Sequence, residues 1–346
     1  MNKNIKAFVS IASIALLLSA CRSAGRNTTS EVSITTSGNS TTTVAPTTIS
    51  STVSSVTSED PTTISITSES SSAESTASSE SSATSSSVES STSENISSSY
   101  TTSLPPDVDD YYASISDSLT GEALLGALRS LNKTKRKSTV GYSAMGTSPA
   151  GQFKYTDYDP STVKYDENGQ PYGTKIISFY SGNPTSNFNR EHVWPKSHGG
   201  NLVESDIHMP RPTIASENGS RGNSFYVEGK CDQASGWDPA MESFGKEDYR
   251  GDSARIIFYC CIASDKLSLI EAESHTTSNS NRDNLMGKLS DMLSWNLRYA
   301  VQDREQRRND GAEYLQGNRN PFIDHPEYAC RIWGTANDKA RQVCGM

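Results

Sequence analysis

The residues of this chain best suited to chemistry lie close together, between Ser186 and Asn223. Within this segment Glu191 stands beside His192, and Asn218 and Arg221 follow at short range. Together they offer a carboxylate and an amide oxygen as metal ligands, an imidazole as a base, and a guanidinium that could hold a phosphate. A one-metal enzyme needs this combination in order to hydrolyse a phosphodiester bond.

Each of these side chains has an expected role. Mg²⁺ prefers oxygen ligands and keeps several waters, so Glu191 and Asn218 would suffice to seat it, with Mn²⁺ or Ca²⁺ as alternatives. Neutral His192 suits the role of general base, because its unperturbed pKa lies near physiological pH. Arg221 could form paired hydrogen bonds to the charge that develops on the phosphate.

Three of these assignments have alternatives in the sequence. Asn223 could replace Asn218 as the ligand, Arg190 or Arg319 could replace Arg221 as the clamp, and His208 could either orient the site or simply pack. Adjacent residues of a regular strand point to opposite faces. Two neighbouring site residues can therefore face one phosphate only if the strand twists or ends there, which the nearby Pro195 favours.

The segments around these residues predict a hairpin followed by a short helix. Residues 175–180 and 189–194 have the composition of extended segments, and the turn-rich stretch 181–187 between them suggests that they pair. A helix is expected over 213–221, where a Pro and a Thr give start signals.

Helices account for most of the remaining pattern. Apolar stripes predict one helix over 119–132 and another around 285–293. Asp252 is a good N-cap for the apolar run 254–263, and a last helix is expected over 303–316, ended by Gly317. The predicted fold is a mostly helical α+β domain around a small β core.

The first third of the chain differs sharply in composition. From residue 27 to 104, 48 of 78 residues are Ser or Thr, too polar to offset the entropy of ordering. Residues 1–21 have the basic and apolar regions of a signal peptide, ending in Leu-Ser-Ala-Cys21, which resembles a bacterial lipobox. We therefore expect lipidation at Cys21, a disordered tether over 22–106 and a catalytic domain over 107–346 outside the membrane.

Charge and cysteine content add weaker constraints. The formal net charge is −9, which argues mildly against a nucleic-acid binder, although a basic run over 133–137 could supply a local patch. Such a run is more often a solvated helix end. Cys330 and Cys344 could form a terminal disulfide, whereas Cys260 and Cys261 have the character of buried apolar residues.

Several separated motifs resemble those of one family of secreted bacterial nucleases, the endonuclease I family of the ββα-metal, or His-Me finger, group. The central motifs are Asn189-Arg-Glu-His-Val-Trp-Pro-Lys-Ser197, Asp206-Ile-His208 and Asn218-x-x-Arg-x-Asn223. Further matches at 177–181, 308–309 and 316–327 extend the resemblance over roughly residues 115–335.

The resemblance implies that His192 is the general base and that Glu191 and Asn218 are the metal ligands. It also implies cleavage of DNA, and often RNA, with little sequence preference, to leave 5′-phosphate ends. The implied core is a β-hairpin with a crossing helix inside a larger mixed domain. We expect the protein to act as a monomer.

Two other interpretations fit these residues. One is a zinc hydrolase that uses His192, Asp206 and His208, since zinc favours three protein ligands and a water. The other is a non-catalytic lipoprotein that binds nucleic acid or glycans at the cell surface. A binding protein has no need of a carboxylate beside an imidazole, so the loss of His192 would leave its function intact.

Overall fold

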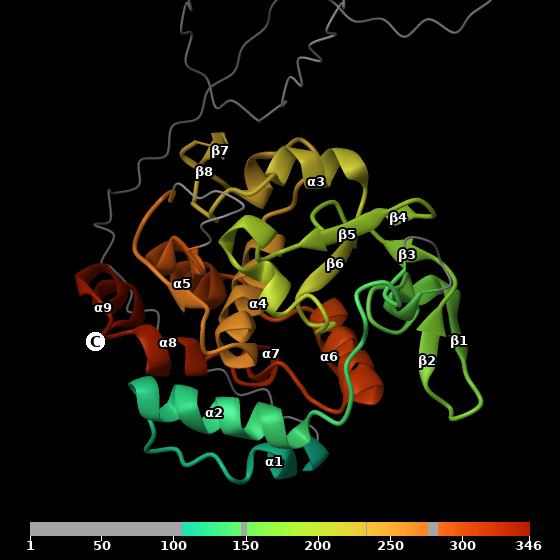
Figure 1. The fold of residues 1–346 in the computed structure, drawn as a ribbon, viewed down its shortest axis with the longest axis horizontal. Helices are drawn as coiled ribbons and strands as arrows, with labels where there is room; N and C mark the ends of the chain where they lie inside the picture. The colour runs from blue at the N-terminus through green and yellow to red at the C-terminus, as the bar shows by residue number, and fades with distance from the viewer. Residues whose placement is uncertain (1–105, 147–150, 233, 276–282) are drawn as a thin grey trace, which may run out of the picture. The chain divides into compact units, whose positions relative to one another are not determined.

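A computed structural model describes residues 106–146, 151–232, 234–275 and 283–346, which belong to one compact unit (Figure 1). The expectations for the signal peptide, for Cys21 and for the tether up to residue 105 lie outside these ranges. None of the helices in the described ranges combines the length and the apolar character needed to cross a bilayer.

Helices dominate the structure and the strands are short. The helices are α1 (Pro106–Tyr112), α2 (Gly121–Lys135), α3 (Ala215–Arg221), α4 (Tyr249–Ala263), α5 (Leu289–Arg298), α6 (Asp303–Gln316), α7 (Pro321–Asp324), α8 (Tyr328–Trp333) and α9 (Asp338–Cys344). The strands are β1 (Val163–Tyr165), β2 (Pro171–Gly173), β3 (Ile176–Ile177), β4 (Pro184–Thr185), β5 (Asn189–His192), β6 (Pro210–Thr213), β7 (Cys231–Asp232), β8 (Gly236–Trp237), β9 (Ser268–Leu269) and β10 (Leu285–Met286). The α+β class predicted from the sequence is confirmed.

The strands of the described ranges pair two by two rather than forming one sheet. The pairs β1–β2, β3–β4, β5–β6 and β7–β8 are antiparallel, whereas β9 and β10 pair in parallel. Such small pairs are stable only when they pack against other elements. The helices therefore supply most of the core, and the strands place side chains on its edge.

Helix α4 forms the centre of the largest apolar cluster. Every residue from Tyr249 to Ile262 is buried, so this helix is surrounded on all sides. It packs against α5, α2 and α7, and Figure 1 shows these three around it. A helix buried all round has no polar face, which explains why amphipathic periodicity does not mark it in the sequence.

The pairing of β5 corrects one prediction. The turn-rich stretch joins only the two-residue strands β3 and β4, because Ile176 pairs with Thr185 and Ile177 with Pro184. Strand β5 instead pairs antiparallel with β6, which lies beyond a long connection, and α3 follows β6 directly. The prediction that segments 175–180 and 189–194 pair with one another was therefore wrong, although each segment contains a strand.

The helix predictions vary in accuracy. The helix over 119–132 is confirmed as α2, and α6 has the predicted bounds and ends at Gly317, whose φ of 89° is left-handed. Three short helices follow α6, so it is not the last. The helix around 285–293 starts only at Leu289, because Leu285 belongs to β10.

Asp252 is not the N-cap predicted from the sequence, because α4 already begins at Tyr249. Its carboxylate accepts a hydrogen bond from Arg211 of β6 at 2.9 Å, and Arg211 also donates to Asp157 at 2.8 Å. A second buried pair, Arg255 with Glu305 at 2.6 Å, joins α4 to α6. Buried ion pairs thus tie the strand that carries the site to the central helices.

The predicted cysteine states are confirmed. Cys330 and Cys344 form a disulfide that joins α8 to α9, with Cα atoms 5.6 Å apart. Cys260 and Cys261 are free and buried in α4.

Candidate active site

A cavity of about 210 Å³ lies where β5 and α3 end. We call it the catalytic cavity after the role that the sequence predicts for some of its residues. Its lining residues are Arg190, Glu191, His192, Pro195, Lys196, Asn218, Gly222 and Asn223. The structure therefore brings Glu191, His192 and Asn218 together, as the sequence predicted, whereas Arg221 does not line the cavity.

The end of β5 lets two neighbouring side chains share one cavity. His192 is the last residue of the strand, and the backbone bends at Val193 and Trp194 before Pro195. Val193 and Trp194 are completely buried, which anchors the bend in the core. The alternation of a regular strand therefore stops at His192, and the geometric difficulty noted in the sequence is resolved.

Glu191 is a buried carboxylate with few partners. Only 1% of the residue is exposed; the Tyr180 hydroxyl donates to its Oε1 at 2.9 Å, and Arg221 Nε lies 3.5 Å from the same atom. Burial raises the pKa of Glu191, and the opposing effects of Arg221 and Tyr180 do not cancel that rise. Within the described ranges, Arg221 is thus the one cation beside the Glu191 carboxylate, and it lies too far away for a strong ion pair. A second cation in the cavity would stabilise the ionised carboxylate.

Tyr180 is a site residue to which the sequence analysis assigned no role. Its backbone has a φ of 70°, an unusual left-handed conformation for an aromatic residue. Its hydroxyl also lies 2.7 Å from that of Tyr226, so the phenol is held between Glu191 and a second buried tyrosine. Backbone strain of this kind is often concentrated at functional sites.

Arg221 is fully buried behind the cavity. Its Nη2 donates to the Val193 carbonyl at 2.7 Å and its Nη1 to the Gly222 carbonyl at 3.2 Å. Its guanidinium also lies 4.9 Å from the centre of the Tyr226 ring. These contacts hold the bend after β5 and place a positive charge beside Glu191. They leave the guanidinium turned to protein groups rather than to the cavity.

His192 is held by a carboxylate that the sequence analysis did not single out. Its Nε2 lies 3.3 Å from Glu204 Oε2, and Lys196 Nζ lies 2.8 Å from the same oxygen. Burial would raise the pKa of Glu204, but Lys196 and His192 hold it below its usual range. An ionised carboxylate only accepts hydrogen bonds, so the proton of neutral His192 lies on Nε2 and leaves Nδ1 as the basic nitrogen.

The protonation state of His192 fits a general base. Burial lowers its pKa to about 4, against the opposing effect of Glu204. The ring also packs on Tyr142, with the ring centres 4.8 Å apart. The imidazole is therefore neutral at physiological pH and can accept a proton.

The amide of Asn218 is oriented by a neighbour on β5. Its Nδ2 donates to Asn189 Oδ1 at 3.1 Å, which leaves Oδ1 as the atom available to a cation. Asn223 also lines the cavity, but it is exposed. The held amide of Asn218 is the better preorganised of the two.

Two other residues weighed in the sequence analysis lie outside the cavity. Arg319 is bound to Asp324 at 2.8 Å, to Asp310 at 2.9 Å and to Glu313 at 2.7 Å, so its charge is already neutralised. His208 is buried, and its Nε2 donates to the Asn318 carbonyl at 3.0 Å.

Arg190 does line the cavity. It donates to the Tyr142 carbonyl at 2.9 Å and lies over the Tyr142 ring. The rival zinc site finds no support within the part of the chain that the structure describes, because no three His, Cys, Asp or Glu side chains converge there in a way that could hold a metal.

Comparison with known proteins identifies the family. The family model of endonuclease I matches residues 120–327. An extracellular ribonuclease of Bacillus amyloliquefaciens is 31% identical over 263 residues, which cover 68% of this chain and 82% of the relative. An extracellular ribonuclease of Bacillus subtilis (strain 168) is 32% identical over 245 residues, which cover 66% and 79%.

The match spans every residue that lines the catalytic cavity, and both relatives carry the name of a nuclease. This chain belongs to the endonuclease I family and is a nuclease, a hydrolase of phosphodiester bonds.

Proposed function

We propose that this protein is a divalent-metal-dependent endonuclease that cleaves DNA and RNA with little sequence preference and leaves 5′-phosphate ends. The observation that carries the proposal is the convergence of Glu191, His192 and Asn218 on one cavity. Both relatives are named extracellular ribonuclease, which supports including RNA beside DNA among the substrates.

The residues present fit a hard divalent cation such as Mg²⁺. Glu191 is a buried carboxylate whose pKa is raised by burial, and its nearest cation is 3.5 Å away. Asn218 offers an oriented amide oxygen on the same cavity. Two protein oxygens suit an ion that keeps several waters and also binds the substrate's phosphate. When bound, such an ion would polarise the phosphate and stabilise the charge on the leaving oxygen.

The protein's own groups then have distinct roles. His192 accepts the proton of the attacking water at Nδ1, and Glu204 fixes its tautomer by holding Nε2. Arg190 and Lys196 line the cavity and present positive charge to the incoming phosphate. Arg221 is better suited to positioning Glu191 and the bend after β5 than to clamping the phosphate, because it is buried against backbone carbonyls.

A ββα-metal core is part of the proposal. Strand β5 carries Glu191 and His192, its antiparallel partner β6 follows in the chain, and α3 comes next with Asn218. This order of two paired strands and a helix supports the ββα-metal core that the resemblance implied. The second strand of the pair is then β6, at 210–213, and not the segment before β5.

The place of action is also a proposal. Both relatives are named extracellular, which supports export of this chain. The lipobox-like sequence that ends at Cys21 favours a lipid anchor on the outer face of the membrane, and we propose that the anchored enzyme is a monomer.

One assay with two controls tests the proposal. The purified protein should degrade plasmid DNA, linear DNA and RNA, should lose activity on chelation, and should regain it with Mg²⁺ or Mn²⁺ but not with Zn²⁺. His192→Ala should lower the cleavage rate by about 10²–10⁴-fold, the usual contribution of a general base, while the circular dichroism spectrum stays unchanged.

His275→Ala is the matched control, because the His275 side chain is 46% exposed and does not line the catalytic cavity. Its cleavage rate should equal that of the unaltered protein. Cleavage by His192→Ala at the unaltered rate would overturn the assigned mechanism. Restoration by Zn²⁺ alone would favour the zinc hydrolase, and strand binding without any cleavage would favour the binding protein.

A further inference from the structure

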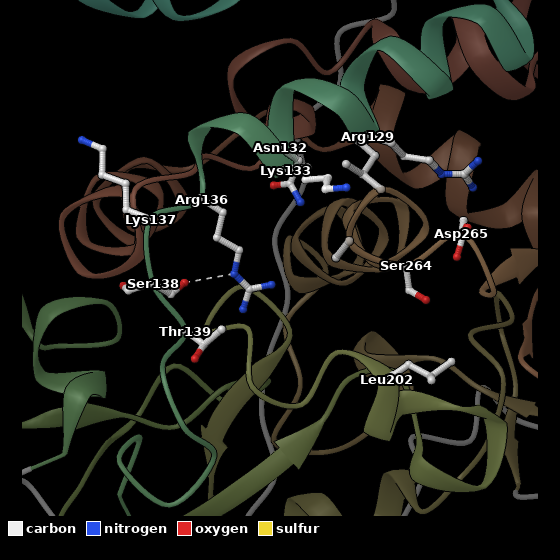
Figure 2. A pocket seen from close by; sticks show the side chains of 12 residues that line it. Arg129, Asn132, Lys133, Arg136, Lys137, Ser138, Thr139, Leu202, Ser264 and Asp265 are labelled. Carbon is white, nitrogen blue, oxygen red and sulfur yellow. Dashed lines mark hydrogen bonds between the residues drawn. The ribbon is translucent and has the colours of Figure 1, made fainter.

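A second, larger cavity lies at the carboxyl ends of α2 and α4. Its volume is about 650 Å³, within the usual range of ligand-binding clefts. We call it the basic cavity. Figure 2 shows Arg129 and Lys133 on α2 facing Ser264 and Asp265, which follow α4, with Leu202 on the opposite side from α2.

The charge of the basic cavity is opposite to that of the whole chain. Its lining residues include four cations, Arg129, Lys133, Arg136 and Lys137, and one anion, Asp265, which gives a net charge of +3. The chain as a whole carries −9. Because an acidic protein repels a polyanion at long range, a local basic surface is what a nucleic-acid-degrading enzyme of this composition needs.

The cations differ in how far they are already engaged. Arg129 donates its Nε to the Cys261 carbonyl at 2.9 Å, and Arg136 lies 3.1 Å from the buried Asp206. Lys133 and Lys137 are exposed. In Figure 2 the ammonium group of Lys137 extends away from the other cations, which places it at the rim. The two lysines are therefore the groups best able to meet a phosphate from solution.

A single short segment separates the basic cavity from the catalytic cavity. Leu202 lines the basic cavity, and Glu204, two residues later, contacts His192. Two residues of extended chain span at most about 7 Å. Arg136 fixes the next residues by donating to the Ser205 carbonyl at 2.8 Å and pairing with Asp206. The linings of the two cavities thus approach one another at this segment, over a separation that a strand of several nucleotides is long enough to span.

We propose that the basic cavity is a second binding site for the phosphodiester backbone of the substrate, which takes phosphates of the same strand at a distance from the one that is cleaved. The proposal rests on the proposed function, because it presumes a polynucleotide in the catalytic cavity. Exposed lysines hold phosphates as point charges and read no base. The site therefore adds affinity for long strands without adding sequence preference.

The competing explanation is structural. Cations at the carboxyl end of a helix are stabilised by its dipole, which contributes about 0.3–1 kcal/mol each. That explanation predicts that charge reversal lowers thermal stability and leaves strand binding unchanged. The second-site proposal predicts the opposite pattern, so one variant measured in both ways separates them.

The test uses the double variant Lys133→Glu/Lys137→Glu and measures binding of fluorescent single strands by anisotropy in the presence of a chelator. The dissociation constant for strands of about 16 nucleotides should rise about tenfold, for DNA and for RNA. The slope of the logarithm of affinity against the logarithm of salt concentration should fall by about 1.4, because each lost contact to a single strand removes about 0.7. Strands of about 4 nucleotides should show a much smaller change.

The matched control is Lys164→Glu/Lys175→Glu, which reverses two exposed charges that line neither cavity. Equal weakening by the control would show that only total charge matters and would overturn the proposal. Unchanged affinity of the Lys133→Glu/Lys137→Glu variant for long strands would overturn it too. So would a loss of binding to phosphatidylglycerol vesicles in that variant while strand binding is kept, since the cavity would then serve a membrane.

Because binding is measured under chelation, the result does not depend on cleavage. A protein that binds long strands through these lysines but cleaves none with Mg²⁺ would contradict the proposed function and support the second site. A protein that cleaves normally, and whose affinity for long strands is unchanged by charge reversal, would support the proposed function and contradict the second site.

Discussion

Two fully buried carboxylates, Glu191 and Asp252, stand in opposite electrostatic situations a short distance apart in the fold. Glu191 on β5 lies directly opposite Arg211 of β6 in the strand register, and Arg211 is the partner of Asp252. Burial raises the pKa of both carboxyls. For Asp252 the charges of Arg211 and Arg304 reverse the effect and hold the pKa below its usual range, whereas for Glu191 the pKa stays raised.

The difference separates a charge that stabilises the fold from one that we propose to hold a metal ion. The ionised form of Asp252 is compensated by hydrogen bonds from two arginines, so it stabilises the junction between β6 and α4. Glu191 has one arginine at 3.5 Å and one phenol, an incomplete shell that favours the arrival of a further cation. A buried acidic group with a raised pKa on a cavity is the more informative pointer to chemistry.

The sharpest test of this comparison exchanges each carboxylate for its amide. Glu191→Gln should lower Mg²⁺-dependent cleavage by more than about 100-fold, because losing even an outer partner of a metal ligand commonly costs 10–100-fold. Its free energy of unfolding in urea should fall by less than that of Asp252→Asn, because the charge that is removed is poorly compensated, although the buried Arg221 loses its carboxylate neighbour at 3.5 Å.

Asp252→Asn is the reciprocal variant. It should lower the free energy of unfolding by about 3 kcal/mol, because it leaves the buried Arg211 and the partly buried Arg304 with one fewer anion. At a temperature where it is folded, its requirement for Mg²⁺ should match that of the unaltered protein. A large loss of stability in Glu191→Gln with little loss in Asp252→Asn would refute the distinction.

A buried histidine away from the cavity extends the comparison to acid pH. Burial lowers the pKa of His208 to about 4, against the opposing charge of Asp206. The unfolded imidazole binds a proton below about pH 6.5, whereas the folded one does so only below about 4. The stability that this difference contributes is present above pH 6.5 and is lost as the pH falls towards 4, by about 3 kcal/mol in all.

The measurement is urea unfolding at pH 7 and near pH 4.5 for the unaltered protein and for His208→Gln. The variant should lose less stability between the two pH values than the unaltered protein does. Parallel losses in the two proteins would show that His208 does not carry this part of the pH dependence.

The smallest predicted effect concerns the phenol beside Glu191. Tyr180→Phe removes the hydrogen bond to Glu191 and should raise the Mg²⁺ concentration needed for half-maximal cleavage by about tenfold, with a similar rate at saturating Mg²⁺. Tyr259→Phe is the matched control, because Tyr259 donates at 2.7 Å to the buried Asp206, outside the catalytic cavity. An equal shift in both variants would argue for a general loss of packing.

The sequence predicted the parts of the site that are local in the chain. Glu191, His192 and Asn218 were expected together, and they line one cavity. Glu204 was not expected, because nothing in its own neighbourhood marks it and its contact with His192 depends on how the connection after β5 folds back. The burial of Arg221 was also invisible, since an arginine at the end of a polar helix normally lies in water.

In the fold, too, the features that depend on nearby residues were predicted from the sequence, and those that depend on distant contacts were not. Helices α2 and α6 were predicted because their apolar stripes and stop signals are local. The partner of β5 was not, because a nearby turn suggested pairing with a closer segment while β6 lay further along the chain. Asp252 was misread as a cap because its true partner, Arg211, is brought to it only by the tertiary fold.

The left-handed backbone at Tyr180 has an evolutionary consequence. Glycine would relax a backbone with a φ of 70° but would remove the phenol, and phenylalanine would keep the ring and the strain without the hydroxyl. Asparagine tolerates such a backbone but is too short to replace the phenol. Each single replacement satisfies one requirement and fails the other, so this position is expected to resist drift even though Tyr180 does not line the catalytic cavity.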